Sequence, residues 1–200
     1  MKTSHKRIGT RWEKGLIAMT LGIMIFGFMT PLDLSAQNRK GFILNLGLGG
    51  AVVSSKYDHP DAERTNQFGV GTDFKIGYAP TDRLLLYYSN DAAFTGVPEG
   101  SNQEGILATG LSGLGATYFL NLDQGSFYVD GAVGASARNF ISTDDGAVDS
   151  DTGFGFSIGG GWEFAPHWLL DADLIFGKVD VGIGDLKTNI FRVGVIWLLY

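Results

Sequence analysis

The strongest constraint on the fold is a two-residue alternation of apolar with small or polar side chains, which runs through most of the chain after Gly41. Successive side chains of an extended strand point to opposite faces, so this period is typical of strands with two unlike faces. The alternation is clearest in residues 68–78, 153–164 and 168–177. In the second of these segments, for example, Phe154, Phe156 and Ile158 alternate with glycine and serine.

Weaker segments with the same period bring the expected number of strands to eight. They cover residues 42–48, 83–94, 106–120, 127–138 and 187–200. The third and fourth strands in chain order are partly apolar on both parities, so the sequence leaves open which of their side chains face inward. In the last strand Phe191 and Val193 belong to the cleaner apolar row, which places Arg192 on the opposite face.

The connections between these segments alternate in length. Short connections rich in turn-forming residues fall at 80–82, 121–125 and 165–167. Longer polar links fall at 54–66, 95–104, 140–152 and 179–186. Short turns at one end and long loops at the other predict an all-β fold, an eight-stranded antiparallel up-and-down transmembrane β-barrel.

Composition favours a membrane barrel over a soluble one. The chain has 30 glycines, and the row opposite the apolar one is mostly Gly, Ala and Ser, which suit the crowded interior of an eight-stranded barrel. A soluble secreted barrel that binds an apolar ligand would instead turn its apolar row inward, and it stays open as an alternative. Aromatic residues near the strand ends are candidates for girdles at the bilayer interface: Phe42, Tyr78, Phe127, Phe164, Trp168, Phe176 and Trp197.

Residues 1–36 have the order of a secretory signal peptide. A basic head is followed by the apolar run 16–29 and then by the small residues Ser35 and Ala36. This run is shorter than the roughly 20 residues that a transmembrane helix needs. We expect cleavage near Ala36 or Gln37, which leaves residues 37–200 as one barrel domain, and an uncleaved N-terminal anchor is the alternative. The lost segment carries five basic and two acidic side chains, so the net charge moves from −6 to −9, and nucleic acid is not an expected partner.

The signal ending Leu34-Ser35-Ala36-Gln37, the glycine-rich strands and the final strand 191–200 resemble the small outer-membrane β-barrel family of Gram-negative bacteria. This family includes the opacity-type adhesins and the X-type outer-membrane proteins. The resemblance implies an outer-membrane location, with membrane lipid and lipopolysaccharide as surroundings. It also implies that Tyr200, the terminal aromatic residue, is a recognition signal for the barrel-assembly machinery.

The inward row of such a barrel carries charged side chains of both signs. Its members are Asp73, Lys75, Asp130, Arg138, Glu163, Asp171, Asp173 and Arg192. In a low dielectric these groups must pair, so we expect a hydrogen-bonded plug, because eight strands leave no channel of porin width. The alternative is a narrow path for ions or small solutes.

The sequence offers little for catalysis or for a cofactor. The two histidines after residue 36 are His59, beside Pro60 in a long link, and His167, in a tight turn, so neither lies mid-strand beside a serine. The chain has no cysteine and its histidines are isolated from one another, so no zinc constellation can be assembled. The acidic stretch 144–151 lacks a calcium-loop motif, so we expect it to be a solvated loop.

These observations predict a non-enzymatic protein without a cofactor. The strands would provide a stable anchor, and the acidic loops would present whatever is recognised outside the cell, including a possible extracellular ligand. The predicted role is therefore structural or one of surface interaction.

Overall fold

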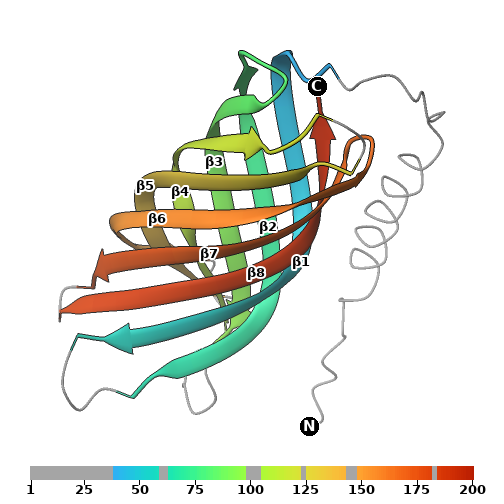
Figure 1. The fold of residues 1–200 in the computed structure, drawn as a ribbon. Coiled ribbons are helices and arrows are strands. Elements are labelled where there is room, and N and C mark those ends of the chain that lie inside the picture. Colours follow the sequence, from blue (N-terminus) through green and yellow to red (C-terminus); the bar gives the residue numbers. More distant parts are fainter. Residues whose placement is uncertain (1–37, 59–62, 98–104, 123–124, 143–147, 182–183) are drawn as a thin grey trace, which may run out of the picture. The chain divides into compact units, whose positions relative to one another are not determined.

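The computed structural model describes residues 38–58, 63–97, 105–122, 125–142, 148–181 and 184–200. They form the antiparallel strands β1 (Gly41–Tyr57), β2 (Thr65–Ala79), β3 (Leu84–Gly96), β4 (Gly105–Phe119), β5 (Phe127–Ser142), β6 (Val148–Ala165), β7 (Trp168–Asp180) and β8 (Asp185–Leu199). Each strand pairs with the next and β8 pairs back with β1, so the sheet closes into a barrel (Figure 1). The predicted eight-stranded antiparallel barrel is confirmed, whereas the predicted signal peptide, residues 1–36, lies outside the described residues. No helix in the described part of the chain has the length and apolar composition needed to cross a bilayer.

The two ends of the barrel differ, and we name them by what they carry. At the terminal end β1 begins and β8 finishes, and the connections there are short, with β6 and β7 joined by the two residues Pro166 and His167. His167 adopts a left-handed φ of 68°, which is uncommon for a residue other than glycine. The loop end carries the other four connections.

At the loop end the strands run farther than the sequence pattern predicts. β1 reaches Tyr57 and β2 already begins at Thr65, so the predicted long link 54–66 is shorter than expected. Four acidic residues assigned to loops lie instead within strands: Asp149, Asp151, Asp180 and Asp185. The backbone hydrogen bonds between strands continue here, but the residues on both faces are polar. The apolar–polar alternation that would reveal a strand in the sequence is therefore lost.

The apolar row faces outward around the barrel. Phe68, Tyr78 and Phe154 are 82%, 60% and 66% exposed, and most of the other large apolar side chains of this row are exposed too. In β3 the structure resolves the facing that the sequence leaves open, because Leu85, Tyr87 and every second residue after them are buried. The outer surface is therefore the apolar one, as a barrel in lipid requires.

The lumen is packed in three layers. A middle layer of charged side chains, described below, lies between two apolar layers. Toward the loop end the buried apolar side chains include Ala51, Val53, Ala93, Leu111, Ile175, Val179, Leu186 and Ile190. Toward the terminal end they include Ile43, Leu85, Phe119, Leu169, Ile196 and Leu198. Within the part of the chain that the structure describes, these layers leave no wide path for water along the barrel axis.

Candidate functional site

Seven charged side chains from five strands meet in the middle of the lumen and form what we call the charged layer. Its members are Asp73 and Lys75 of β2, Asp91 of β3, Asp130 of β5, Asp171 and Asp173 of β7, and Arg192 of β8. All seven side chains are between 3% and 6% exposed. Carboxyl groups therefore outnumber cations within the layer.

Arg192 is the centre of the charged layer. Its Nη2 lies 2.5 Å from Asp173 Oδ2, 2.8 Å from Asp73 Oδ2 and 3.2 Å from Asp91 Oδ1. Its Nε donates a second hydrogen bond to Asp173, and its Nη1 donates to the backbone carbonyl of Thr72. One guanidinium therefore links β8 to β2, β3 and β7, as the planar fork of arginine allows.

Lys75 is the second cation of the layer. Its Nζ donates to Asp130 Oδ2 at 2.6 Å and lies 3.2 Å from Asp73 Oδ2, so Asp73 bridges the lysine and Arg192. A tyrosine on the side of the charged layer that faces the terminal end extends the network. The Tyr128 hydroxyl donates to Asp171 Oδ2 at 2.6 Å.

Glycines of the inward row provide the space for these long side chains. A Cβ added at Gly71 would lie 2.6 Å from Arg192 Cδ, and one added at Gly159 would lie 2.7 Å from Asp130 Oδ1. Both distances are too short for non-bonded heavy atoms in contact. A small cavity beside Arg192 has a volume of about 10 Å³, space for about one water molecule.

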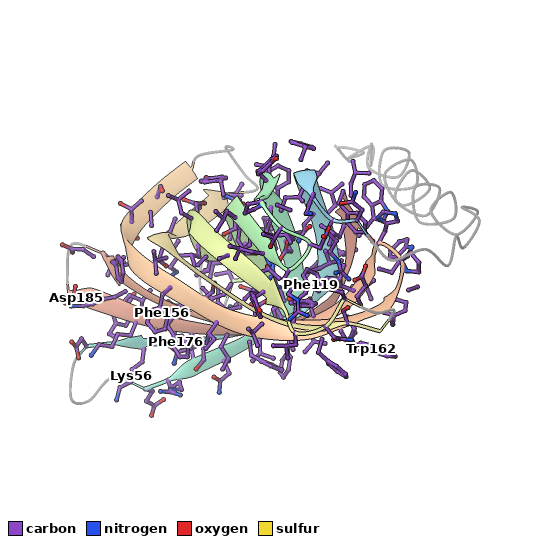
Figure 2. The ribbon with its side chains drawn as sticks, turned by 45° about the horizontal axis from the view of Figure 1, so that its top comes forward. Lys56, Phe119, Phe156, Trp162, Phe176 and Asp185 are labelled. Atoms are coloured by element: carbon purple, nitrogen blue, oxygen red, sulfur yellow. The ribbon has the colours of Figure 1, made fainter. Side chains whose placement is uncertain are left out.

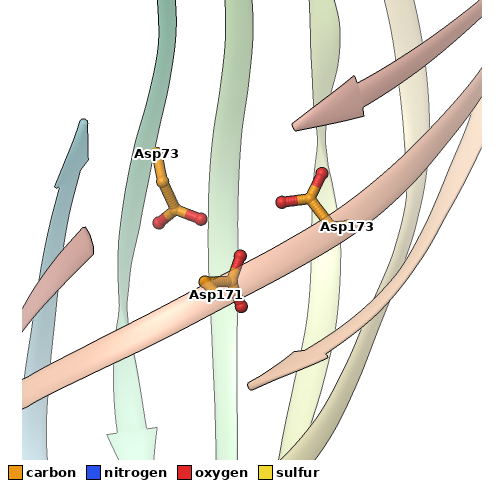
Figure 3. A group of neighbouring side chains, drawn as sticks. All are labelled: Asp73, Asp171 and Asp173. Carbon is orange, nitrogen blue, oxygen red and sulfur yellow. The ribbon is translucent and has the colours of Figure 1, made fainter. Parts of the chain in front are cut away.

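Three carboxylates of the layer have the spacing of a metal site but surround a side chain instead. Asp73, Asp171 and Asp173 each offer an oxygen, and these atoms all lie within 4.8 Å of one another (Figure 3). Arg192 Nη2 lies 2.8, 3.9 and 2.5 Å from oxygens of these three groups. The guanidinium thus already supplies the positive charge that a metal ion would bring, and we assign no metal to this site.

A second ionic cluster closes the terminal end. Arg39, which precedes β1, is fully buried, forms an ion pair with Glu163 of β6 and lies 3.9 Å from the centre of the Phe119 ring. The Tyr200 hydroxyl donates to the same Glu163 at 3.3 Å. Burial, together with the nearby Glu163 carboxylate, raises the pKa of Tyr200, so this phenol stays a hydrogen-bond donor at physiological pH.

The structure divides the residues that the sequence places in the lumen. All eight lie on inward-facing positions, and six of them meet in the charged layer. Glu163 belongs to the separate cluster with Arg39. Arg138 lies near the loop end of β5 opposite Asp151 in register, is only half-buried, and forms no ion pair with a described residue of the charged layer. Neither Arg138 nor Glu163 is therefore a member of the charged layer.

Sequence reasoning misses Asp91 and Arg39. Asp91 is hidden because its strand is apolar on both parities, although β2 and β3 place it directly opposite Asp73. The sequence does not reveal that register. Arg39 is missed because it precedes the first alternating segment. The excess of acidic over basic residues on the inward row is a signal for a missing cation such as Arg39, but it gives no sign of Asp91.

The remaining predicted candidates have ordinary surroundings. His167 Nδ1 is hydrogen-bonded to the Leu198 carbonyl at 2.8 Å, and its ring packs on Tyr200 at 4.4 Å between centroids. His59, Asp144 and Asp145 lie outside the described residues.

Comparison with known proteins agrees with this architecture. A family profile described as outer membrane protein beta-barrel domain matches residues 19–197. Among solved structures the chain is similar to Ail, the attachment invasion locus protein of Yersinia pestis, with 18% identity, a TM-score of 0.53, and coverage of 80% of this chain and 99% of that one. It is also similar to Neisserial surface protein A, with 16% identity, a TM-score of 0.52, and coverage of 78% and 96%.

At these identities the solved structures establish the fold alone. No curated protein matches the chain at a significant level. The profile, by contrast, spans most of the chain, so the predicted outer-membrane location and the predicted resemblance are confirmed. The chain belongs to the outer-membrane β-barrel protein family.

Proposed function

We propose that this protein is a closed, non-enzymatic barrel that anchors a surface-interaction or structural element in the outer membrane. The observation that carries the proposal is the layering of the lumen. Arg192 and Lys75 hold the charged layer together with direct ion pairs, and buried apolar side chains cover it on both sides. A conducting path would have to break this network and displace these side chains.

The described residues favour this role over catalysis. A nucleophile needs a base within hydrogen-bond reach. Nδ1 of His167 is instead hydrogen-bonded to a backbone carbonyl, and the His167 ring packs on Tyr200. Both contacts stabilise a turn. The carboxyl groups of the charged layer are enclosed between apolar side chains, where no substrate reaches them.

The surface-interaction part of the proposal rests on the loop end. There the strands continue past the outer apolar row, so polar and charged residues project beyond the part of the barrel that lipid covers. Ail, which shares this architecture, has been crystallised in complex with the heparin analogue sucrose octasulfate. By analogy, we propose that the loop end of this chain holds its extracellular contacts.

Conductance measurement on the full mature chain tests the closed lumen. The protein is refolded into detergent, shown to be folded by heat-modifiable gel mobility, and inserted into a planar bilayer. We expect the heat-shifted band without discrete conductance steps. Reproducible steps from folded protein would refute the closed lumen and support the narrow-channel alternative.

We further propose that Tyr200 serves the barrel-assembly machinery before the barrel closes. In the folded state its ring packs on His167 and its hydroxyl bonds to Glu163, so the residue is half-buried. Recognition would therefore act on the unfolded chain. Tyr200→Phe, which keeps the ring, should assemble normally in cells, whereas Tyr200→Ala should assemble poorly. If Tyr200→Ala also refolds poorly into pure lipid vesicles, without any machinery, the residue's role is structural.

A further inference from the structure

The charged layer holds more negative than positive side chains. Its two cations, Lys75 and Arg192, face five aspartates, so three negative charges stay uncompensated if every carboxyl group is ionised. All seven side chains are between 3% and 6% exposed. Because an uncompensated charge is very costly in such surroundings, the layer must bind positive charge from solution.

Apolar side chains shield the charged layer from solvent. Leu111 lies on its loop side and Phe119 on its terminal side, and neither is more than 1% exposed. Outside the wall, Phe156 stacks on Phe176 with ring centroids 5.0 Å apart, on the lipid-facing side of β6 and β7 (Figure 2). The cavity beside Arg192 has a volume of only about 10 Å³. Bulk water therefore does not screen the excess charge.

Asp73 and Asp91 form a first pair of carboxyl groups. The two residues lie directly opposite each other in β2 and β3, and their side chains are within hydrogen-bond reach. Asp73 Oδ2 lies 2.8 Å from Arg192 Nη2 and 3.2 Å from Lys75 Nζ. Asp91 Oδ1 lies 3.2 Å from the same arginine nitrogen but forms no hydrogen bond with a described residue. Asp73 therefore has the stronger contacts to cations, and Asp91 is the member that can lose its charge.

Asp171 and Asp173 form a second pair. They are two residues apart on β7 and share its inward face, with oxygens within 4.8 Å of each other (Figure 3). Asp173 accepts hydrogen bonds from both Nε and Nη2 of Arg192. Asp171 Oδ1 lies 3.9 Å from Nη2, and its Oδ2 accepts from the Tyr128 hydroxyl. Asp173 is thus the ionised member, and Asp171 is the one that can be neutral.

A shared proton turns repulsion within each pair into attraction. Two ionised carboxylates are both acceptors and cannot hydrogen-bond to each other, whereas a protonated carboxyl group is a donor. Asp73 and Asp173 each keep one buried oxygen, Oδ1, that accepts no hydrogen bond from the residues that the structure describes. Each ionised member therefore has an acceptor to spare.

The other groups around the two pairs do not remove the need for protons. The titratable and charged groups that surround Asp91 and Asp171 beyond their own partners are Lys75, Tyr87, Tyr128, Asp130 and Arg192. The positions directly opposite members of the pairs on β1, β4, β6 and β8 carry side chains that do not titrate: Gly47, Leu111, Gly161 and Gly194. Both cations of this set already contact ionised aspartates.

We propose that the charged layer is a binding site for two protons, one on Asp91 shared with Asp73 and one on Asp171 shared with Asp173. The layer then holds three carboxylates and two cations, so its excess falls from three negative charges to one. Carboxyl groups of the unfolded chain are ionised at neutral pH, so the barrel takes up both protons from solution as it folds. The inference uses the burial of the layer and goes beyond the surface role proposed above.

A proton suits this site better than a metal cation. Arg192 Nη2 already lies among the oxygens of Asp73, Asp171 and Asp173, where an ion would have to bind. A proton needs no cavity, because it lies between two oxygens that are already in reach of each other.

Infrared spectroscopy of the folded full mature chain detects the protons directly. A protonated carboxyl group has a C=O stretching band separate from the bands of a carboxylate, and this band shifts in heavy water. In a detergent without carbonyl groups, the wild type should show the band at neutral pH. Asp91→Asn and Asp171→Asn should each remove about half of it, since the asparagine amide donates in place of the acid. The control Asp58→Asn removes an exposed carboxylate paired with Lys187 at 2.9 Å and should leave the band unchanged.

Urea unfolding at several pH values counts the protons by an independent route. The folded barrel holds protons that the unfolded chain releases, so its stability falls as the pH rises. Each retained proton raises the equilibrium constant for unfolding about 10-fold per pH unit. Between about pH 6 and about pH 9, where unfolded carboxyl groups are ionised, this constant should rise about 10-fold less per pH unit in Asp91→Asn than in the wild type. Asp171→Asn should behave in the same way, and Asp58→Asn should match the wild type.

Several results would overturn the proton site, and the first needs no variant. One is the absence of the protonated band from the folded wild type. Another is a band, or a pH dependence of unfolding, that neither Asp91→Asn nor Asp171→Asn changes. Stability that depends on sodium chloride instead of choline chloride at constant pH, and not on pH, would show that a metal cation balances the layer. Heat-modifiable gel mobility confirms that each protein is folded.

Discussion

Replacing Arg192 by methionine tests the charged layer most directly. Methionine keeps much of the aliphatic volume but removes the group whose Nη2 lies within 3.9 Å of four carboxylates. Lys75 would then be the only cation of the layer, with five carboxyl groups around it. Breaking a buried ion pair by removing one partner costs about 3–5 kcal/mol, because the other charge stays buried and uncompensated. We expect a loss of this size in the free energy of unfolding.

Asp91→Asn is the matched control for this variant. Asp91 Oδ1 lies 3.2 Å from Arg192 Nη2, but this oxygen forms no hydrogen bond. Because carboxyl groups outnumber cations in the layer, loss of one negative charge should change the stability by no more than about 1 kcal/mol. The two variants therefore alter neighbouring buried groups in opposite electrostatic directions.

Urea unfolding in phospholipid vesicles measures both variants. The folded fraction is read from the heat-modifiable gel band, and the free energy of unfolding comes from linear extrapolation. If Arg192→Met unfolds within about 1 kcal/mol of the wild type, or if Asp91→Asn loses more than Arg192→Met, the charged layer does not stabilise the barrel as argued.

Five further variants test the packing of the lumen, the facing of the strands and the ion pair of Glu163. Gly71→Ala should cost about 1–3 kcal/mol by displacing a buried side chain, whereas Gly50→Ala, whose Cβ meets nothing within 4 Å, should be neutral in the same urea assay. Phe156→Arg places a cation in lipid and should cost about 2–4 kcal/mol. Ser157→Arg points into the packed lumen and reports on the packing there, so the result that would contradict the outward facing is unchanged vesicle insertion of Phe156→Arg. Glu163→Gln removes the negative charge that pairs with the buried Arg39 and should cost about 3–5 kcal/mol in unfolding free energy, and unchanged stability would contradict that estimate.

The sequence by itself determines the class of fold and the facing of most strands. Alternation along 68–78, 153–164 and 168–177 follows from the strand geometry and depends on no distant contact. The choice of an apolar outside follows from residue types, because glycine and serine opposite Phe154 and Phe156 suit a crowded lumen. The outer-membrane family follows from the same features.

Only the tertiary structure decides which charges meet. Asp73 and Asp91 are neighbours because β2 and β3 pair with a particular register, and no local pattern specifies that register. Closure of the barrel then brings Arg192, far away in the chain, onto both of them. Local alternation fixes which face a residue occupies, whereas strand register and closure fix its neighbours.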